Sequence, residues 1–207
     1  MQPQSKDDPV IYLHGFASGP GSTKARFFRD RIPHLRILDL AQGDFARLTI
    51  SGQLHVIERE AMGSPSVLIG SSLGGYLAAL YAARHAEATK LALLAPAFGF
   101  ARRWAQSAGA EEWRRNGFTE VFHYGDGRMR RLNYSFLEDA LQYEDFPDFK
   151  QPALIFHGTR DDVVPAEMSA RFAASHANTR LTMLDSDHQL TDALDAIWRE
   201  TAPFLLG

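Results

Sequence analysis

Short apolar runs recur along the chain and are separated by longer amphipathic stretches. Several runs are continuously apolar and bounded by Gly, Pro, Asp or His, as is usual for strands of a parallel sheet covered on both faces. The pattern predicts strands at residues 10–13, 36–38, 67–69, 90–94, 154–157 and 180–183. It predicts helices at residues 24–31, 53–62, 73–85, 166–175 and 191–203. Such alternation produces βαβ units, so we expect an α/β fold with a doubly wound, mostly parallel sheet of about six strands.

Residues 96–149 break this alternation, because the stretch is too long for a simple crossover. It is rich in aromatic side chains: Trp104, Trp113, Phe118, Phe122, Tyr124, Tyr134, Phe136 and Tyr143. Gly125-Asp126-Gly127 predicts a hairpin between residues 120–124 and 128–133, and Ser135 is a suitable cap for a helix that runs to about Tyr143. We interpret the stretch as a cap or lid inserted into a single domain of residues 1–207. The alternative is a decorated crossover that packs on the core.

Length, charge and cysteine usage narrow the function classes. The 207 residues fit one domain, since single α/β domains often reach about 200–250 residues. The net charge of −3 argues against a nucleic-acid binder, which usually carries a strong basic excess. The absence of cysteine excludes disulfides, cysteine-based metal sites and thiol nucleophiles. No H-E-x-x-H or comparable ligand spacing occurs, so we expect neither a metal nor a cofactor.

The sequence contains no recognisable signal peptide or membrane-spanning segment. Residues 1–9 are polar and contain no apolar core of a signal peptide. The longest apolar run, near residues 91–97, is much shorter than the roughly 20 residues of a membrane-spanning helix. We therefore expect a cytoplasmic protein without a membrane span.

The strongest chemical motif is Gly70-Ser71-Ser72-Leu73-Gly74, which has the form G-x-S-x-G. It follows a predicted apolar strand and opens a predicted helix, which is the context of a nucleophile elbow. Strand and helix approach closely at such a turn, so both flanking positions favour glycine. Ser72 is therefore the candidate nucleophile. The alternative, a glycine-rich phosphate-binding turn, lacks the lysine of a Walker loop and the spacing of a dinucleotide fingerprint.

A serine hydroxyl needs a histidine base, and hydrolases built around this elbow supply the residues in the order Ser, acid, His. His188 is the best of eight histidines, because it lies in a polar loop between the last predicted strand and the last helix. His14 and His157 border strands and fit structural roles. The remaining five lie in helices or have no acid at the right topological place: His34, His55, His85, His123 and His176.

The acid is expected in the loop that follows the strand at residues 154–157. Asp161 and Asp162 both satisfy this topology. We favour Asp161, because Asp162 adjoins the apolar pair Val163-Val164 and is suited to pointing away or capping a turn. Asp185 and Asp187 share a loop with His188, and turn formation is the simpler role for them.

A serine hydrolase also needs donors for the oxyanion that forms during acyl transfer. In this type of site they are two backbone N–H groups, one after the nucleophile and one in a loop after an early strand. Leu73 occupies the first position. Phe16, in His14-Gly15-Phe16 directly after the first predicted strand, occupies the second.

These motifs together resemble those of the YqiA-like esterases, small bacterial α/β-hydrolases. The resemblance rests on Tyr12-Leu13-His14-Gly15-Phe16 with Ser18, Pro20, Ser22 and Lys24-Ala25, on Ile69-Gly70-Ser71-Ser72-Leu73-Gly74-Gly75-Tyr76, and on Asp187-His188. His157-Gly158, Asp161 and Val164-Pro165 are similar to the acid loop of α/β-hydrolases generally. The resemblance implies the α/β-hydrolase fold and cofactor-free hydrolysis of carboxylic esters or acyl thioesters. It would make Ser72 the nucleophile, Asp161 the acid and His188 the base, whereas residues 96–149 match no family motif.

Other activities fit the same motifs. A peptidase or an acyltransferase would use the same fold, because function resides in the site and not in the fold. A binding protein that has lost catalysis is a third alternative, against which the complete set of candidate residues argues.

Arginines suggest which substrates such an enzyme would prefer. Residues 97–132 contain seven arginines and four acidic residues, an excess of three positive charges. Five of them are candidates for a cationic rim around an apolar acyl pocket: Arg102, Arg103, Arg128, Arg130 and Arg131. Such a rim would favour a CoA thioester or another anionic ester. The alternative is a solvated face, on which Glu111-Glu112 pairs locally with Arg114-Arg115.

Overall fold

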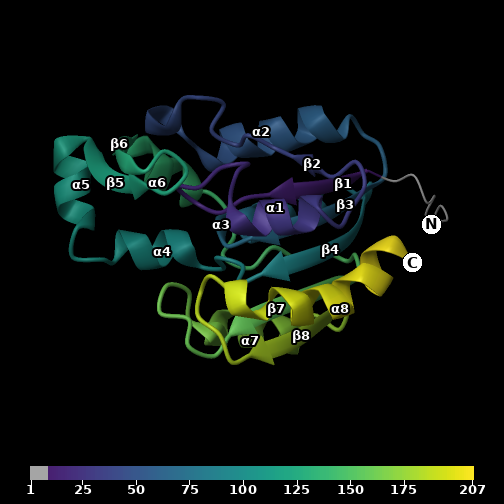
Figure 1. The fold of residues 1–207 in the computed structure, drawn as a ribbon. Helices are drawn as coiled ribbons and strands as arrows, with labels where there is room; N and C mark the ends of the chain where they lie inside the picture. Colours follow the sequence, from purple (N-terminus) through teal and green to yellow (C-terminus); the bar gives the residue numbers. More distant parts are fainter. Residues whose placement is uncertain (1–8) are drawn as a thin grey trace.

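Six parallel strands form the central sheet, in the order β2-β1-β3-β4-β7-β8 (Figure 1). The structure is a computed structural model and is described for residues 9–207. The strands are β1 (Val10–Leu13), β2 (Arg36–Ile37), β3 (Ser66–Ser71), β4 (Ala88–Leu94), β7 (Ala153–Gly158) and β8 (Thr179–Leu184). All six expected strands are present, and the expectation of a doubly wound parallel sheet is confirmed.

Helices cover both faces of the sheet. They are α1 (Thr23–Arg29), α2 (Ile50–Ala61), α3 (Leu73–Arg84), α7 (Ala166–Ser175) and α8 (Leu194–Leu206), with short 3₁₀ turns η1 (Phe45–Arg47) and η2 (Thr191–Ala193). Side chains alternate along β1, so that Tyr12 packs with α1 and α8, and Ile11 packs with α2 and α3. Helix α8 continues through Pro203 to Leu206, whereas the pattern predicted its end at Pro203.

Residues 96–149 form a compact group of elements beyond the ends of β1 and β4 (Figure 1). They comprise α4 (Phe100–Ala105), α5 (Ala110–Asn116), β5 (Phe118–His123), β6 (Arg128–Asn133) and α6 (Ser135–Ala140). The predicted hairpin is present as β5 and β6, which pair in antiparallel fashion. Its turn is attached to the loop after β1, because the Tyr124 N–H donates to the Ala17 carbonyl at 2.7 Å.

Two details of this group differ from the sequence analysis. Helices α4 and α5 were not predicted. The expected cap Ser135 is the first residue of α6, whose N-terminal flanking residue is Tyr134, and the helix ends at Ala140.

Within residues 9–207, no helix is both long enough and apolar enough to cross a membrane. The sequence analysis expects no signal peptide in residues 1–9. Of these residues, all but Pro9 lie outside the described part of the chain.

Candidate active site

Ser72 stands on a sharp turn between β3 and α3. Its φ of 53° and ψ of −116° are unusual for a residue with a side chain, and such conformations cost about 1–3 kcal/mol. The neighbouring backbone holds the turn, because the Ser72 N–H donates to the Leu94 carbonyl at 2.8 Å and the Ser72 carbonyl accepts from the Ala97 N–H at 3.0 Å. A strained residue that is tied down from both sides is typical of functional sites.

Gly70 and Gly74 flank Ser72 where strand β3, helix α3 and the end of strand β1 come close together, so a side chain at either position would collide with the backbone. A Cβ atom on Gly70 would overlap the backbone of Gly74, and one on Gly74 would overlap the carbonyl oxygens of Leu13 and His14. The elbow is therefore packed directly against the end of β1. This explains why the motif requires glycine on both sides of the serine.

Replacing Gly74 by alanine tests this packing. Alanine is the better helix former by about 0.5–1 kcal/mol, so an unhindered exchange would stabilise the protein. Because the methyl group would overlap the β1 backbone, we expect Gly74→Ala to lower the free energy of unfolding by about 1–3 kcal/mol or more. Urea denaturation measures the change. Gly21→Ala is the matched control, since no atom lies within 4 Å of its added Cβ, and equal stabilities of the two variants would contradict the packing argument.

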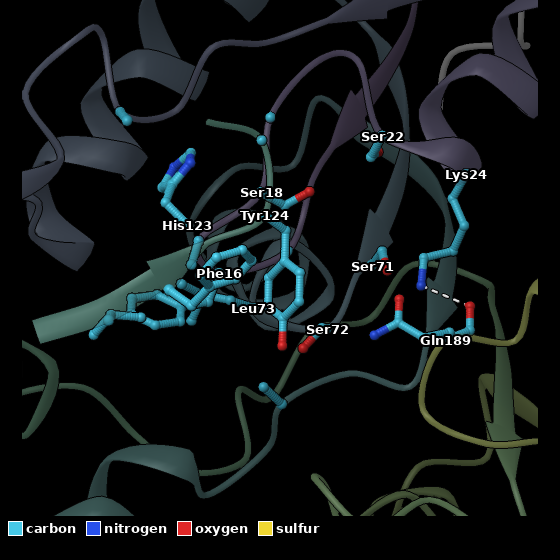
Figure 2. Close-up of a pocket in the computed structure, with 18 of the residues that line it drawn as sticks. Phe16, Ser18, Ser22, Lys24, Ser71, Ser72, Leu73, His123, Tyr124 and Gln189 are labelled. Atoms are coloured by element: carbon cyan, nitrogen blue, oxygen red, sulfur yellow. Dashed lines mark hydrogen bonds between the residues drawn. The ribbon is translucent and has the colours of Figure 1, made fainter. Parts of the chain in front are cut away.

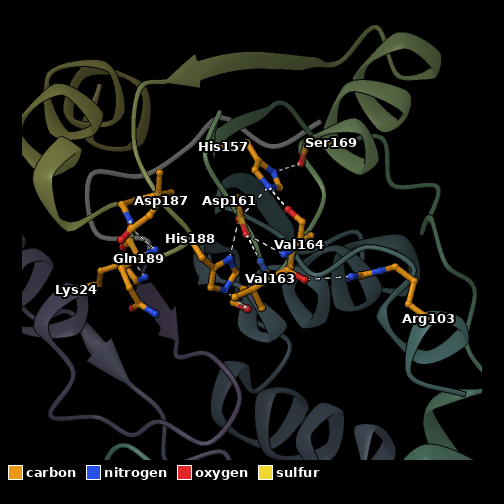
Figure 3. Close-up of polar contacts among 12 residues, drawn as sticks. Lys24, Arg103, His157, Asp161, Val163, Val164, Ser169, Asp187, His188 and Gln189 are labelled. Carbon is orange, nitrogen blue, oxygen red and sulfur yellow. Dashed lines mark hydrogen bonds and ion pairs between the residues drawn. The ribbon is translucent and has the colours of Figure 1, made fainter. Parts of the chain in front are cut away.

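Three candidate side chains from distant parts of the chain form one hydrogen-bonded series (Figure 3 shows its histidine and acid). His188 Nε2 lies 3.0 Å from Ser72 Oγ, and His188 Nδ1 lies 2.7 Å from Asp161 Oδ2. The carboxylate can only accept, so Nδ1 carries the imidazole proton and Nε2 is free to accept from the serine hydroxyl. The arrangement has the geometry of a nucleophile, a base and an orienting acid.

The Asp161 carboxylate is fully buried and has four donors around it. Oδ1 accepts from the N–H groups of Val163 at 2.9 Å and Val164 at 2.8 Å. Oδ2 lies 3.1 Å from His157 Nε2 in addition to its contact with His188. Burial alone would raise the pKa of Asp161, but the hydrogen bonds from His157, His188 and the Val164 N–H outweigh it and hold the pKa well below its ordinary value.

His157 contributes to the site in a way that the sequence analysis missed. Its Nε2 faces two acceptors, the Val164 carbonyl at 2.9 Å and Asp161, so Nε2 carries a proton. Its Nδ1 lies 2.7 Å from the hydroxyl of Ser169 on α7, and the ring is fully buried. His157 therefore holds the same carboxylate oxygen that contacts His188. A histidine at the end of an apolar strand, directly before the acid loop, was the available signal.

The other acidic candidates lie apart from His188 Nδ1. Asp162 is exposed. Asp185 forms an ion pair with Arg160 at 2.9 Å. Asp187 accepts from the Gln189 N–H at 2.8 Å, which is the turn-forming contact considered for it.

The loop after β1 places Phe16 and Gly15 beside the serine. A Cβ on Gly15 would lie 3.4 Å from Ser72 Cβ, so this backbone passes directly over the elbow. Among the described residues, neither the Phe16 N–H nor the Leu73 N–H donates to a protein acceptor. His14 holds the loop, with Nδ1 2.9 Å from the Gly15 carbonyl and Nε2 accepting weakly from the Leu40 N–H at 3.5 Å. Burial lowers the pKa of His14, which favours the neutral ring that this pair of contacts needs.

Ser72 and His188 open into a cleft of about 1070 Å³, which has an apolar and a polar end. We call its apolar end the apolar arm; it is lined by Phe16, Phe45, Phe100, Trp104 and Val121. We call its polar end the polar arm; it is lined by Tyr12, Ser22, Lys24, Ser71 and Gln189. In Figure 2, Ser22, Lys24, Ser71 and Gln189 lie on one side of Ser72, and Phe16 and His123 lie on the other.

Only two of the five candidate arginines line this cleft. Arg103 and Arg130 line it, and both have protein partners: Arg103 donates to the Val163 carbonyl at 3.1 Å, and Arg130 pairs with Asp126. The other three are not among its lining residues. Arg102 pairs with Asp145 at 2.6 Å, Arg131 stacks over Phe118 at 4.3 Å, and Arg128 is exposed. Arg114 pairs with Glu111 at 2.9 Å, as the solvated-face alternative expects.

Comparison with known proteins gives one family match and one curated relative. The family model described as "Uncharacterised protein family (UPF0227)" matches residues 9–204. The mitochondrial palmitoyl-protein thioesterase ABHD10 of Bos taurus is 26% identical over 219 residues, which cover 93% of this chain and 70% of that protein.

Solved structures share the architecture at lower identity. Mouse alpha/beta hydrolase domain-containing protein 10 superposes with a TM-score of 0.75 at 19% identity, over 96% of this chain and 92% of that one. A protein of Agrobacterium vitis S4 superposes with a TM-score of 0.82 at 22% identity, over 99% of this chain and 91% of that one. At these identities the likeness establishes the fold alone.

Proposed function

Because this chain belongs to the uncharacterised protein family UPF0227 and has the α/β-hydrolase fold, we propose that it is a serine hydrolase of carboxylic esters or acyl thioesters. The observation that carries the proposal is the series Ser72–His188–Asp161, with contacts of 3.0 and 2.7 Å, whose Ser72 and His188 line a cleft. Its chain order, serine, acid and histidine, is that of hydrolases with a nucleophile elbow.

The proposed reaction follows from the positions of these groups. Ser72 Oγ attacks the acyl carbonyl while His188 Nε2 accepts the hydroxyl proton. Asp161 keeps the proton of the ring on Nδ1 and stabilises the imidazolium that forms. The free N–H groups of Phe16 and Leu73 bind the oxyanion. His188 then protonates the departing alcohol or thiol, and water releases the acyl group by the same steps in reverse order.

The apolar arm is the proposed acyl site. Its five side chains include four aromatic rings, and Phe16 packs against Phe45 and Trp104 with centroid distances of 5.5 and 5.1 Å. Burial of a methylene group on such a surface contributes about 0.8 kcal/mol, so affinity should rise with acyl length until the arm is filled. The bovine relative is described as a palmitoyl-protein thioesterase, which supports including acyl thioesters among the substrates. The elements of residues 96–149 form much of this arm and act as its lid in the proposal.

A labelling experiment tests the proposal directly. A fluorophosphonate probe reacts with activated serines, so we expect it to label the protein at Ser72, with the site identified by peptide mass spectrometry. Matched nitrophenyl esters, acyl thioesters and anilides then define the reaction, and we expect ester or thioester turnover to exceed anilide turnover. Absence of labelling would favour a binding protein. Preferential anilide cleavage would favour a peptidase, and transfer to an added alcohol in place of water would favour an acyltransferase.

A further inference from the structure

We infer that the polar arm binds an anionic group, a carboxylate or a phosphate, carried by the leaving group of the substrate, and that Lys24 is its principal ligand. This inference rests on the proposed function and specifies the chemistry of one side of its substrate. It is carried by the burial of Lys24, by the buried Tyr12 hydroxyl that lines the same arm, and by the position of the arm relative to His188.

Lys24 is a buried cation that forms no direct ion pair in the part of the chain that the structure describes, and Asp187 and Asp161 act on it only from a greater distance. Only 8% of the residue is exposed, and its Nζ donates to the Gln189 carbonyl at 2.7 Å (Figure 2). One acceptor leaves two of the three N–H donors of the ammonium group available. No ion pair of Lys24 occurs among residues 9–207. A buried charge normally has a partner, so its absence points to a partner that arrives with the substrate.

The position of Lys24 in α1 does not favour its charge. It lies in the first turn of this helix, where the helix dipole disfavours a cation. Burial lowers the pKa of Lys24 to about 8, against the opposing influence of Asp187 and Asp161. The ammonium form still predominates at neutral pH. A side chain that is charged in an unfavourable place is better explained by ligand binding than by stability.

The Tyr12 hydroxyl supplies a second, independent observation. It is fully buried and lines the same arm, where the Ser71 and Ser22 hydroxyls are its polar neighbours, and it makes no hydrogen bond of regular geometry among the described residues. Native proteins leave few buried polar atoms without a well-formed hydrogen bond, because each destabilises the folded state. The hydroxyls of Ser22 and Ser71 line the arm beside it. The arm therefore offers an ammonium group and several hydroxyl donors to an oxygen-rich group.

Charge along the cleft supports an anion at this end. Arg26 also lines the cleft next to Lys24. The acidic residues among the lining side chains are Asp39, after β2, and Asp126, in the turn of the β5–β6 hairpin. Neither belongs to the polar arm, so its lining is positively charged.

Proton transfer from His188 to the leaving group determines which part of the substrate reaches the polar arm. His188 Nε2 must deliver a proton to the departing oxygen or sulfur, so the leaving group lies on the His188 side of the acyl carbon. Gln189, whose carbonyl binds Lys24, directly follows His188. The acyl chain occupies the apolar arm, and the leaving group extends toward Lys24.

Three esters on one scaffold test the inference: phenyl butyrate, 3-carboxyphenyl butyrate and 3-phosphonooxyphenyl butyrate. The readout is the ratio of kcat/KM for each anionic ester to kcat/KM for the neutral ester, which cancels effects on the triad. A charged hydrogen bond corresponds to about a ten- to hundredfold change, so we expect Lys24→Gln to lower at least one ratio by that factor. The ester whose ratio falls further identifies the preferred anion. Phenyl hydrogen succinate carries its charge on the acyl side, and its ratio should change little.

Matched variants distinguish an anion bound at Lys24 from an anion bound elsewhere in the cleft. Lys90→Gln is the control, because Lys90 Nζ also donates to a backbone carbonyl, that of Phe204, at 2.7 Å and lies outside the cleft. Lys24→Met removes the donor as well as the charge, and thermal unfolding of all variants verifies that they fold. Unchanged ratios in both Lys24 variants would overturn the inference, as would a fall confined to Arg130→Gln, which would place the anion at the arginine-lined wall. In both cases Ser72-dependent cleavage of phenyl butyrate would leave the proposed function standing.

Binding of a leaving-group analogue gives a readout that requires no turnover, and the pH dependence of the kcat/KM ratios gives a further one. Calorimetric titration with 3-hydroxybenzoate should show binding that Lys24→Gln weakens about tenfold or more, even if phenyl butyrate is not cleaved; equal binding would overturn the inference. The ratios should fall as the pH rises through about 8, as Lys24 loses its proton. Asp187 and Asp161 act electrostatically on Lys24, and His188, Tyr12 and Arg26 line the same cleft. Titration of the triad affects neutral and anionic esters alike. A ratio that is constant from pH 6 to 9.5 would also overturn the inference.

Discussion

Ser72→Ala is expected to lower kcat for ester hydrolysis by about 10⁶-fold, since triad serines in other enzymes contribute on that order. The exchange removes the only atom that the proposed reaction joins to the acyl group. It leaves the cleft, the free Phe16 and Leu73 N–H groups and His188 in place, so substrate binding should persist. The measurements are kcat from progress curves and the affinity for a non-hydrolysable ether analogue. A loss of only a few fold would mean that another residue is the nucleophile.

The stabilities of two variants at position 72 test whether the backbone of Ser72 is strained. Alanine meets the same steric conflict as serine at a φ of 53°, so Ser72→Ala should have nearly the parental midpoint in urea. Glycine relieves the conflict, so Ser72→Gly should be equally inactive and more stable than Ser72→Ala, by up to about 1 kcal/mol. If Ser72→Gly were the less stable of the two, the turn would not be strained.

Much of the site could be predicted because its determinants are local. The elbow depends on two glycines around one serine, between a strand and a helix, and all of these are visible in a window of about 20 residues. The positions of Asp161 and His188 follow from the order of strands, because each lies in the loop after a recognisable apolar strand. Only the coordinates show that Asp161, and not Asp162, contacts His188, since two adjacent residues satisfy the same topology.

The elements that escaped prediction are short or depend on distant contacts. Helices α4 and α5 have six and seven residues, too few for a clear apolar period. The second partner of Asp161, His157, depends on contacts with Ser169 and Val164 that only the folded chain creates. Lys24 reads locally as a lysine on a helix surface, and its burial results from packing near Gln189, 165 residues away along the chain.

Asp161→Asn is expected to lower kcat by about 10⁴-fold, and the four donors around the carboxylate explain why. The N–H groups of Val163 and Val164 cannot change their role, so the amide oxygen of asparagine must replace Oδ1. The amide NH₂ group then faces His188 Nδ1, which has to accept a hydrogen bond. His188 Nε2 would consequently carry the proton and could no longer accept the proton of Ser72.

The same variant should also be less stable at neutral pH, with a defined pH dependence. Hydrogen bonds lower the pKa of Asp161 in the folded protein, so the carboxylate contributes stability above the ordinary aspartate pKa of about 4 and loses it as the pH falls below that value. The difference in unfolding free energy between the parent and Asp161→Asn should therefore be full at pH 7 and shrink in acid. Asp162→Asn is the matched control, because Asp162 is exposed and adjacent, and it should change activity and stability little. The opposite ranking in both measurements would assign the acid to Asp162.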